Sequence, residues 1–145
     1  MATLVAYYQK HASVVYPLLR GLSLLLALVL FCLFVWGGNQ PEAAGLFQPP
    51  WDKLAHLSWF AVLAGLLDFG LNLRIRFPGA LFCSGVALWD EWRQLFLPGR
   101  SADFGDLVFD GLGILIGLLI ARQIRKILSP IPLVDDFIPI KKISR

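Results

Sequence analysis

The sequence predicts an all-α integral membrane protein, built as a four-helix bundle with both termini in the cytoplasm. Of the 145 residues, 57% are hydrophobic and 16% are charged, and the mean hydropathy is +0.68. Ordinary soluble domains have about 25% charged residues. The apolar residues also gather in runs of about 20, the length that crosses the roughly 30 Å hydrocarbon core of a bilayer.

Four runs are expected to span the membrane, and they cover residues 18–36, 54–71, 78–97 and 106–121. The first carries only Arg20 and ends at Gly37 and Gly38. Its apolar core is longer than the roughly 7 to 15 residues of a signal peptide, which favours an uncleaved anchor. Residues 1–128 then form one membrane domain, and residues 129–145, with three prolines, form a cytoplasmic tail.

The distribution of Lys and Arg predicts the orientation, because these residues are in excess on the cytoplasmic side. With four spans, ten of the thirteen fall on the side of the termini: Lys10, Arg20, Arg74, Arg76, Arg122, Arg125, Lys126, Lys141, Lys142 and Arg145. We therefore expect a multi-pass membrane protein with both ends in the cytoplasm. The net charge of +3 then reflects topology, and it requires no nucleic-acid partner.

Acidic residues gather at the opposite, outer ends of three of these spans. They are Asp52, Asp90, Glu91, Asp103, Asp106 and Asp110. Three separate segments thus send polar groups to one depth on one side of the membrane. Ionisable residues inside a membrane cost about 2.5 to 3.5 kcal/mol each on insertion scales and tend to be paired or functional. This pattern is typical of a site.

Helical spacing groups the polar residues of the second and third spans. Asp52 lies four residues before His56 and Lys53 lies three before it, so all three share one helix face, and Asp52 also suits the positive end of the helix. In the third span Gln94 follows Glu91 by three positions and Asp90 by four. If that span ends at residue 97, Glu91 lies roughly 9 Å inside it.

The fourth span places its aspartates on one stripe, provided that the helix begins by Asp103. They are Asp103, Asp106 and Asp110. Simpler roles remain open at four places: Asp106 as the N-terminal cap of this span, an ion pair between Arg100 and Asp103, a local pair between Asp90 and Arg93, and His56 as a hydrogen-bonded structural histidine.

Cations do not balance these acids. Six carboxyls face only Lys53, Arg93, Arg100 and, when protonated, His56. Either some carboxyls are protonated or a cation completes the site.

The spacing of these residues resembles the signature of the VanZ-like family of small bacterial membrane proteins. The matching positions, within about residues 50–120, read Asp52-Lys53-x-x-His56, then Glu91-x-x-Gln94-x-Phe96-x-Pro98-Gly99-Arg100-x-x-Asp103-x-x-Asp106-x-x-x-Asp110-x-x-Gly113-x-x-x-Gly117. The family commonly has Asn at the position of Asp110. Gly113 and Gly117 have the spacing of a close helix-packing surface and could meet a partner helix. The resemblance implies a location in the bacterial inner (cytoplasmic) membrane. It also implies a role in the cell envelope, because the founding member is associated with low-level resistance to teicoplanin, an acylated glycopeptide.

Three functions from different classes follow. In the first, the protein binds or acts on a lipid, an envelope precursor or a lipoglycopeptide-type compound. Lys53 and Arg100 then hold a phosphate, and the substrate-binding set is completed by Gln94, Asp103 and Asp110. Residues that could move protons, and are therefore the candidates for catalysis, are Asp52, His56, Glu91 and Asp106.

The second function is that of a membrane enzyme assisted by a divalent cation. Its candidate ligands are His56, Glu91, Asp103 and Asp106, a set that suits Mg, Mn or Ca better than a structural zinc. The third is a non-enzymatic assembly partner of another envelope membrane protein. No nucleophile signature accompanies the serines of the spans, so the sequence names no reaction.

Overall fold

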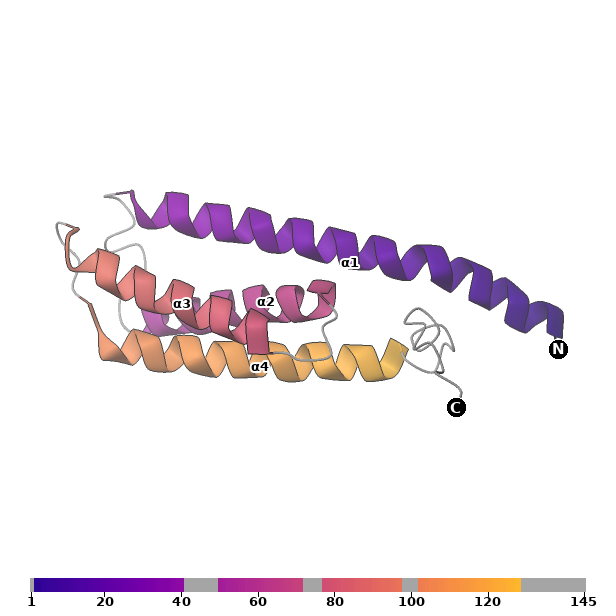
Figure 1. Cartoon of the computed structure of the whole chain (residues 1–145). Coiled ribbons are helices and arrows are strands. Elements are labelled where there is room, and N and C mark those ends of the chain that lie inside the picture. The colour runs from indigo at the N-terminus through magenta and orange to yellow at the C-terminus, as the bar shows by residue number, and fades with distance from the viewer. Residues whose placement is uncertain (1, 41–49, 72–76, 98–101, 129–145) are drawn as a thin grey trace, which may run out of the picture.

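The computed structural model describes residues 2–40, 50–71, 77–97 and 102–128, and this part of the chain forms four helices. They are α1 (Ala2–Gly38), α2 (Trp51–Leu71), α3 (Phe77–Gln94) and α4 (Phe104–Leu128). Successive helices run in opposite directions, so the end of α1, the start of α2, the end of α3 and the start of α4 lie together (Figure 1). We call this end, which carries Asp90, Glu91 and Asp106, the polar end. The opposite end, which carries Arg20 and Arg125, is the basic end. The predicted all-α bundle is confirmed.

The helices differ from the predicted spans mainly at their ends. α1 begins at Ala2 rather than at residue 18, and α4 runs past residue 121 to Leu128. An apolar run marks the residues suited to hydrocarbon, whereas helical hydrogen bonding continues into polar flanking sequence. α3 is shorter than predicted: it stops at Gln94, and the amide of Leu97 turns back to the carbonyl of Gln94 over 3.2 Å.

Three helices within the described ranges are long and apolar enough to cross a membrane: residues Val14–Gly38 of α1, all of α2 and all of α4. α3 is outside this set, and it carries Asp90, Glu91 and Arg93 in its last turns. Because α2 and α4 run in the same direction, the chain returns from the basic end to the polar end through α3, which at 18 residues is about 27 Å long. A fourth crossing and cytoplasmic termini stay predictions.

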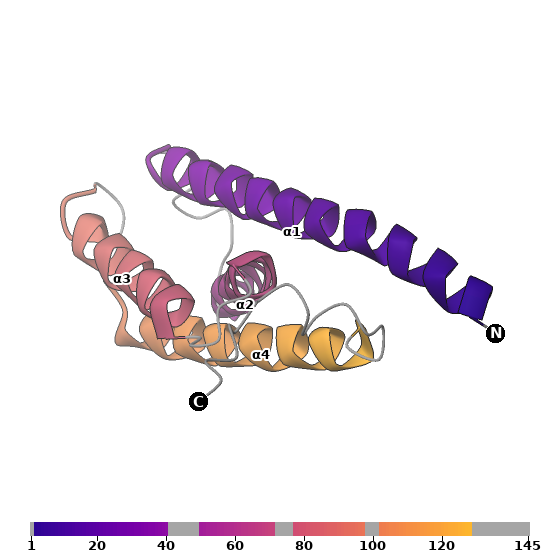
Figure 2. The same ribbon diagram turned by 45° about the vertical axis from the view of Figure 1, so that its right-hand side comes forward.

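α2 is the central helix, and Figures 1 and 2 show it between α1 and α4. Its contact with α4 is the most extensive in the bundle. Two glycines of α4 make this contact close: a Cβ at Gly113 would lie 2.3 Å from the carbonyl oxygen of Leu57, and one at Gly117 would lie 2.1 Å from that of Ala61. The packing predicted for these glycines therefore occurs within the chain, against α2.

Polar contacts fix the basic end as well. Arg125 of α4 forms an ion pair with the buried carboxylate of Asp68 on α2 and also donates to the Asp68 carbonyl oxygen over 2.7 Å. Arg20 of α1 donates to the last carbonyl groups of α2, at Gly70 over 3.0 Å and at Leu71 over 3.1 Å. These bonds satisfy carbonyls that a helix end leaves without partners. Between the two ends the core is apolar, with Phe60, Leu63, Cys83 and Ile114 among its buried side chains.

Candidate functional site

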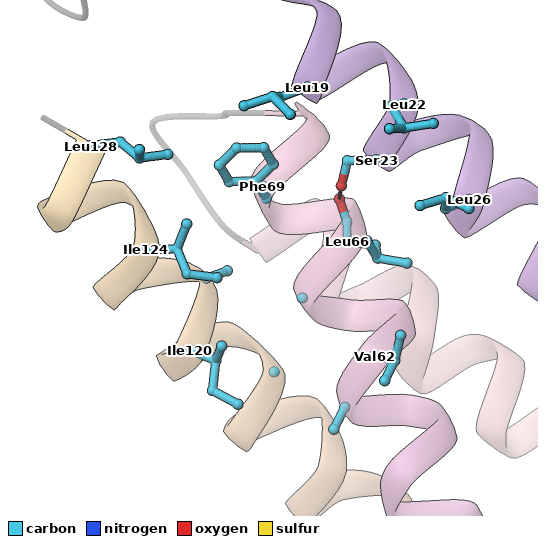
Figure 3. A pocket seen from close by; sticks show the side chains of 14 residues that line it. Leu19, Leu22, Ser23, Leu26, Val62, Leu66, Phe69, Ile120, Ile124 and Leu128 are labelled. Carbon is cyan, nitrogen blue, oxygen red and sulfur yellow. Dashed lines mark hydrogen bonds between the residues drawn. The ribbon is translucent and has the colours of Figure 1, made fainter. Parts of the chain in front are cut away.

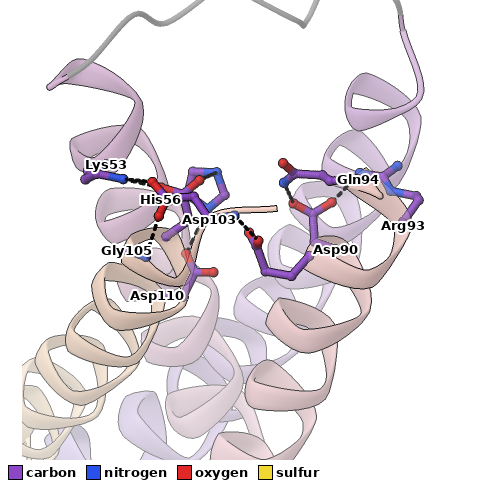
Figure 4. A network of polar contacts seen from close by, with 10 residues as sticks. Lys53, His56, Asp90, Arg93, Gln94, Asp103, Gly105 and Asp110 are labelled. Carbon is purple, nitrogen blue, oxygen red and sulfur yellow. Dashed lines mark hydrogen bonds and ion pairs between the residues drawn. The ribbon is translucent and has the colours of Figure 1, made fainter. Parts of the chain in front are cut away.

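Two residues of α2 face the first turns of α4 at the polar end (Figure 4). Lys53 donates to the carboxylates of Asp103 and Asp106, and its Nζ lies 3.0 Å from Oδ1 of Asp106. One turn later, His56 Nδ1 lies 2.9 Å from Oδ1 of Asp110. Asp106 and Asp110 are four residues apart on α4, and Lys53 and His56 are three apart on α2, so the two helices present matching pairs.

Asp103 caps α4 and does not belong to its helical stripe. It precedes the first helical residue, its Oδ1 accepts from the amide of Gly105 over 2.8 Å, and its carbonyl accepts from the amide of Asp106 over 2.9 Å. This is the bonding of an N-cap residue. From the sequence, Asp106 was a candidate for this cap, but it lies in the first turn of the helix. The hydrogen bond from Lys53, and then that from Gly105, lower the pKa of the Asp103 carboxyl below its ordinary value.

Glu91 brings α3 into the same group of residues. Its Oε2 accepts from the backbone amide of Asp103 over 2.7 Å, and the residue is only 6% exposed. Because α3 ends at Gln94, Glu91 lies about 4.5 Å from the helix end, so the predicted depth of about 9 Å is wrong. It is buried because the start of α4 covers it.

The other polar residues of α3 form a second network that reaches α1. Asp90 forms an ion pair with Arg93 and accepts a hydrogen bond from Gln94 Nε2 over 2.9 Å. Arg93 also donates to Asn39 Oδ1 over 2.8 Å. The local pair that the sequence left open is therefore present. Asn39 was not singled out from the sequence; its position directly after the glycines that end the first apolar run was the available signal.

The structure thus joins six side chains from three elements, which we call the polar cluster: Lys53, His56, Glu91, Asp103, Asp106 and Asp110. Asp52, in the first turn of α2, has a buried Oδ1 and makes no hydrogen bond to the cluster among the residues that the structure describes. Gln94 belongs to the Asp90 network instead. Arg100 and the turn at Pro98 and Gly99 lie outside the described residues.

A comparison with protein families identifies the chain. The family model described as VanZ/LLP1 matches residues 9–128. The chain belongs to the VanZ/LLP1 family. The match covers almost all of the four helices, whereas the motif recognised in the sequence began only at residue 50. No curated protein and no solved structure matches the chain significantly.

The polar cluster of this VanZ/LLP1 protein does not fit the divalent ion considered from the sequence. Over the described ranges, no three His, Cys, Asp or Glu side chains are arranged to hold a metal. The predicted ligands included Asp103 and Asp106, but the Lys53 ammonium lies between their carboxylates. A protein cation therefore already occupies the position where a metal would bridge them.

If all four carboxyls of the cluster are ionised, negative charge remains in excess even when His56 is protonated, since four carboxylates then face two cations. Two of these carboxylates are almost completely buried, with 6% of Glu91 and 1% of Asp110 exposed. Each has one oxygen, Oε1 of Glu91 and Oδ2 of Asp110, without a hydrogen-bond partner in the described part of the chain. The second ring nitrogen of His56, Nε2, lies 4.0 Å from Oδ2 of Asp106. The cluster can therefore accept further hydrogen bonds and can exchange a proton at His56.

Proposed function

We propose that this VanZ/LLP1 membrane protein binds the polar part of an envelope lipid, or of a lipid-linked or acylated compound, at the polar cluster. One observation carries the proposal: Glu91 and Asp110, from different helices and both more than nine-tenths buried, each keep one oxygen without a partner. Burying a polar group without a hydrogen bond costs free energy, and for a charged group the cost is larger. A ligand that donates hydrogen bonds to these oxygens removes that cost.

The charge of the cluster favours hydroxyl or ammonium groups on the ligand over a bare phosphate. Lys53 was assigned to a phosphate from the sequence, but its ammonium donates to Asp103 and Asp106. The free groups of the cluster are acceptors, and its acids outnumber its cations. Sugar hydroxyls and protonated amines are donors, and they occur on lipid headgroups, lipid-linked envelope precursors and lipoglycopeptides alike.

A chemical step on the bound compound is the second candidate function, and the pairing of His56 with Asp110 favours it. A carboxylate on Nδ1 holds a histidine in the tautomer that leaves Nε2 ready to accept a proton. That is the usual arrangement of a general base. Incubation of the purified protein with a donor-bearing lipid, followed by mass analysis of that lipid, tests this function. A mass change that is present with wild type and absent with His56→Asn supports it, and an unchanged lipid with wild type rejects it.

Lipid retention measured by native mass spectrometry tests the binding proposal. The delipidated protein is titrated with phosphatidylethanolamine, whose ammonium donates, with a glucosyl diacylglycerol, whose hydroxyls donate, and with phosphatidylcholine, whose quaternary ammonium cannot. Hydrogen bonds to charged groups contribute about 1.5 to 3 kcal/mol, so we expect one donor-bearing lipid to bind at least about tenfold more tightly than phosphatidylcholine.

Glu91→Gln supplies the decisive variant, because it preserves side-chain volume and removes the charge. We expect it to lose the preference for the donor-bearing lipid. Ser84→Ala, at an exposed position of the same helix, is the control and should behave as wild type. If wild type binds all three lipids equally, or if Glu91→Gln keeps the preference, the polar cluster is not the binding site.

A further inference from the structure

A second place in the bundle has the properties of a ligand site, and it lies away from the polar cluster. It is a groove of about 440 Å³ between α1, α2 and α4, toward the basic end (Figure 3). The groove exists because α1 and α4 both pack on α2 but make almost no contact with each other. Its wall includes Leu22 and Leu26 of α1, Phe69 of α2, and Ile120 and Ile124 of α4.

The wall of the groove is apolar throughout. Its one side-chain hydroxyl, that of Ser23, donates to the carbonyl oxygen of Leu66 over 2.8 Å. Water would find no polar partners there, and an empty groove of this size would forfeit the packing contacts of its lining. Hydrocarbon is the filling that this lining suits.

The length and depth of the groove match one leaflet of a bilayer. Along α4 it extends from Gly117 to Leu128, which is about 16 Å at 1.5 Å per residue and about half of the roughly 30 Å hydrocarbon core. All of this length lies in the half of the bundle next to the basic end. A single acyl chain of that leaflet has the corresponding reach.

Arg20 supplies charge at the mouth of the groove. It follows Leu19, which lines the groove, and its guanidinium lies at the carbonyls of Gly70 and Leu71, directly after Phe69. These partners are neutral, and no carboxylate pairs with Arg20 among the described side chains, since the nearby Asp68 is held by Arg125. Arg20 therefore keeps a positive charge that no carboxylate of the described residues neutralises, beside the C-terminal end of α2, and this charge complements an anionic lipid.

We propose that the groove between α1 and α4 holds one acyl chain of an anionic membrane lipid, with the phosphate of that lipid at Arg20. This site is separate from the polar cluster, takes the opposite headgroup charge, and does not depend on the proposed function.

The test is retention of phosphatidylglycerol by the full-length, delipidated protein, measured by native mass spectrometry. Ile120→Trp fills the groove from a residue that is 53% exposed, whereas Leu119→Trp places the same side chain next to it, at a residue that is 49% exposed and does not line the groove. We expect Ile120→Trp to bind phosphatidylglycerol about tenfold more weakly, because about two methylenes of the acyl chain then lose their burial in the groove. Leu119→Trp should bind as wild type does. Equal binding by the two variants would overturn the site.

The headgroup is tested by comparing phosphatidylglycerol with phosphatidylcholine. We expect wild type to prefer phosphatidylglycerol, Arg20→Gln to reduce this preference about fivefold, and Arg20→Lys, which keeps the charge, to retain it. Thermal unfolding of each variant shows whether the loss of the bonds to α2 has unfolded the protein. Because the glycerol hydroxyls of phosphatidylglycerol are also donors to the polar cluster, the comparison is repeated in Glu91→Gln. The preference for phosphatidylglycerol and its reduction by Arg20→Gln should both persist in that background, which separates this site from the polar cluster. Equal binding of both lipids by wild type would contradict the assignment of an anionic lipid.

Discussion

The ammonium group of Lys53 lies between two aspartates, and this position determines how the polar cluster balances its charge. Lys53 pairs with Asp103 and Asp106, and His56 pairs with Asp110. The Glu91 carboxylate accepts a hydrogen bond only from a backbone amide, that of Asp103. The sequence predicted an excess of acids at this end, because that count depends only on topology. It could not assign each cation to its acid, because the assignment depends on where α4 begins and how the helices are rotated.

Asp103 gives the site a pH dependence in the acidic range. Its pKa is lowered in the folded protein, so its contribution to stability is complete above its ordinary pKa and is lost as the pH falls below about 4. We expect the melting temperature of wild type to fall between pH 5 and pH 3, and that of Asp103→Asn to be lower at pH 7 but to fall less over this range. Thermal melts at each pH measure this. An equal fall in both proteins would contradict the role given to the ion pair with Lys53.

Asp110 allows binding to be separated from folding, because an asparagine amide can keep the bond to His56 while it changes the unpartnered end of the side chain. In Asp110→Asn the amide oxygen can still accept from His56, so we expect the free energy of unfolding to change by no more than about 1 kcal/mol. The unpartnered acceptor Oδ2 becomes a donor, so retention of donor-bearing lipids should fall. Chemical unfolding and lipid retention, measured on the same preparation, check both parts. A variant that folds and retains these lipids as wild type does would remove Oδ2 from the site.

At the scale of the helices, composition predicted which segments are helical better than where they end. The start of α1 and the last two turns of α4, residues 122–128, were missed because polar and charged residues interrupt the apolar runs there while the helices continue. The early end of α3 was missed because its apolar residues continue to Leu97 after the helix has stopped. The glycine pair of α4 was predicted to pack closely, but the spacing of residues on one helix does not identify the helix that packs against it. The structure shows that the partner is α2.

The contact between α2 and α4 should be sensitive to one methyl group. Gly117→Ala would place a Cβ 2.1 Å from the carbonyl oxygen of Ala61, so the helices must separate, and overpacking of this kind costs about 1 to 3 kcal/mol. At Gly111, on the same helix, a Cβ meets nothing within 4 Å. Unfolding in detergent, monitored by circular dichroism, should show a clear loss of stability for Gly117→Ala and none for Gly111→Ala. Equal stability of the two variants would contradict the packing.

The ion pair at the basic end should also be structural. Arg125→Gln leaves the carboxylate of Asp68, which is only 5% exposed, without its cation, and breaking a buried pair costs about 3 to 5 kcal/mol. Arg122→Gln removes a charge from an exposed position of the same helix and is the control. The same unfolding measurement should show a large loss only for Arg125→Gln, with partial recovery when Asp68→Asn is added. No recovery would show that the loss does not come from the unpaired carboxylate.

For the whole molecule, the fold class followed from composition, whereas the number of crossings depends on α3. Its apolar part is interrupted by Asp90, Glu91 and Arg93, so composition alone gives three spans in the described part of the chain. The directions of the helices favour a fourth, because α3 must return the chain to the polar end.

Reporter fusions to the two termini decide between these topologies. Four crossings place both termini on one side, and the excess of Lys and Arg there predicts the cytoplasm. We expect a fluorescent reporter to be active, and a periplasmic phosphatase reporter inactive, at either terminus. Termini on opposite sides would show that α3 does not cross the membrane.

The polar cluster as a binding site is the central claim, and an experimental structure in bilayer discs of bacterial lipid tests it most directly. We predict density of a bound molecule whose donor groups lie within hydrogen-bonding distance of Oε1 of Glu91 and Oδ2 of Asp110. A structure in which both oxygens are bonded only to other groups of the protein would contradict the claim.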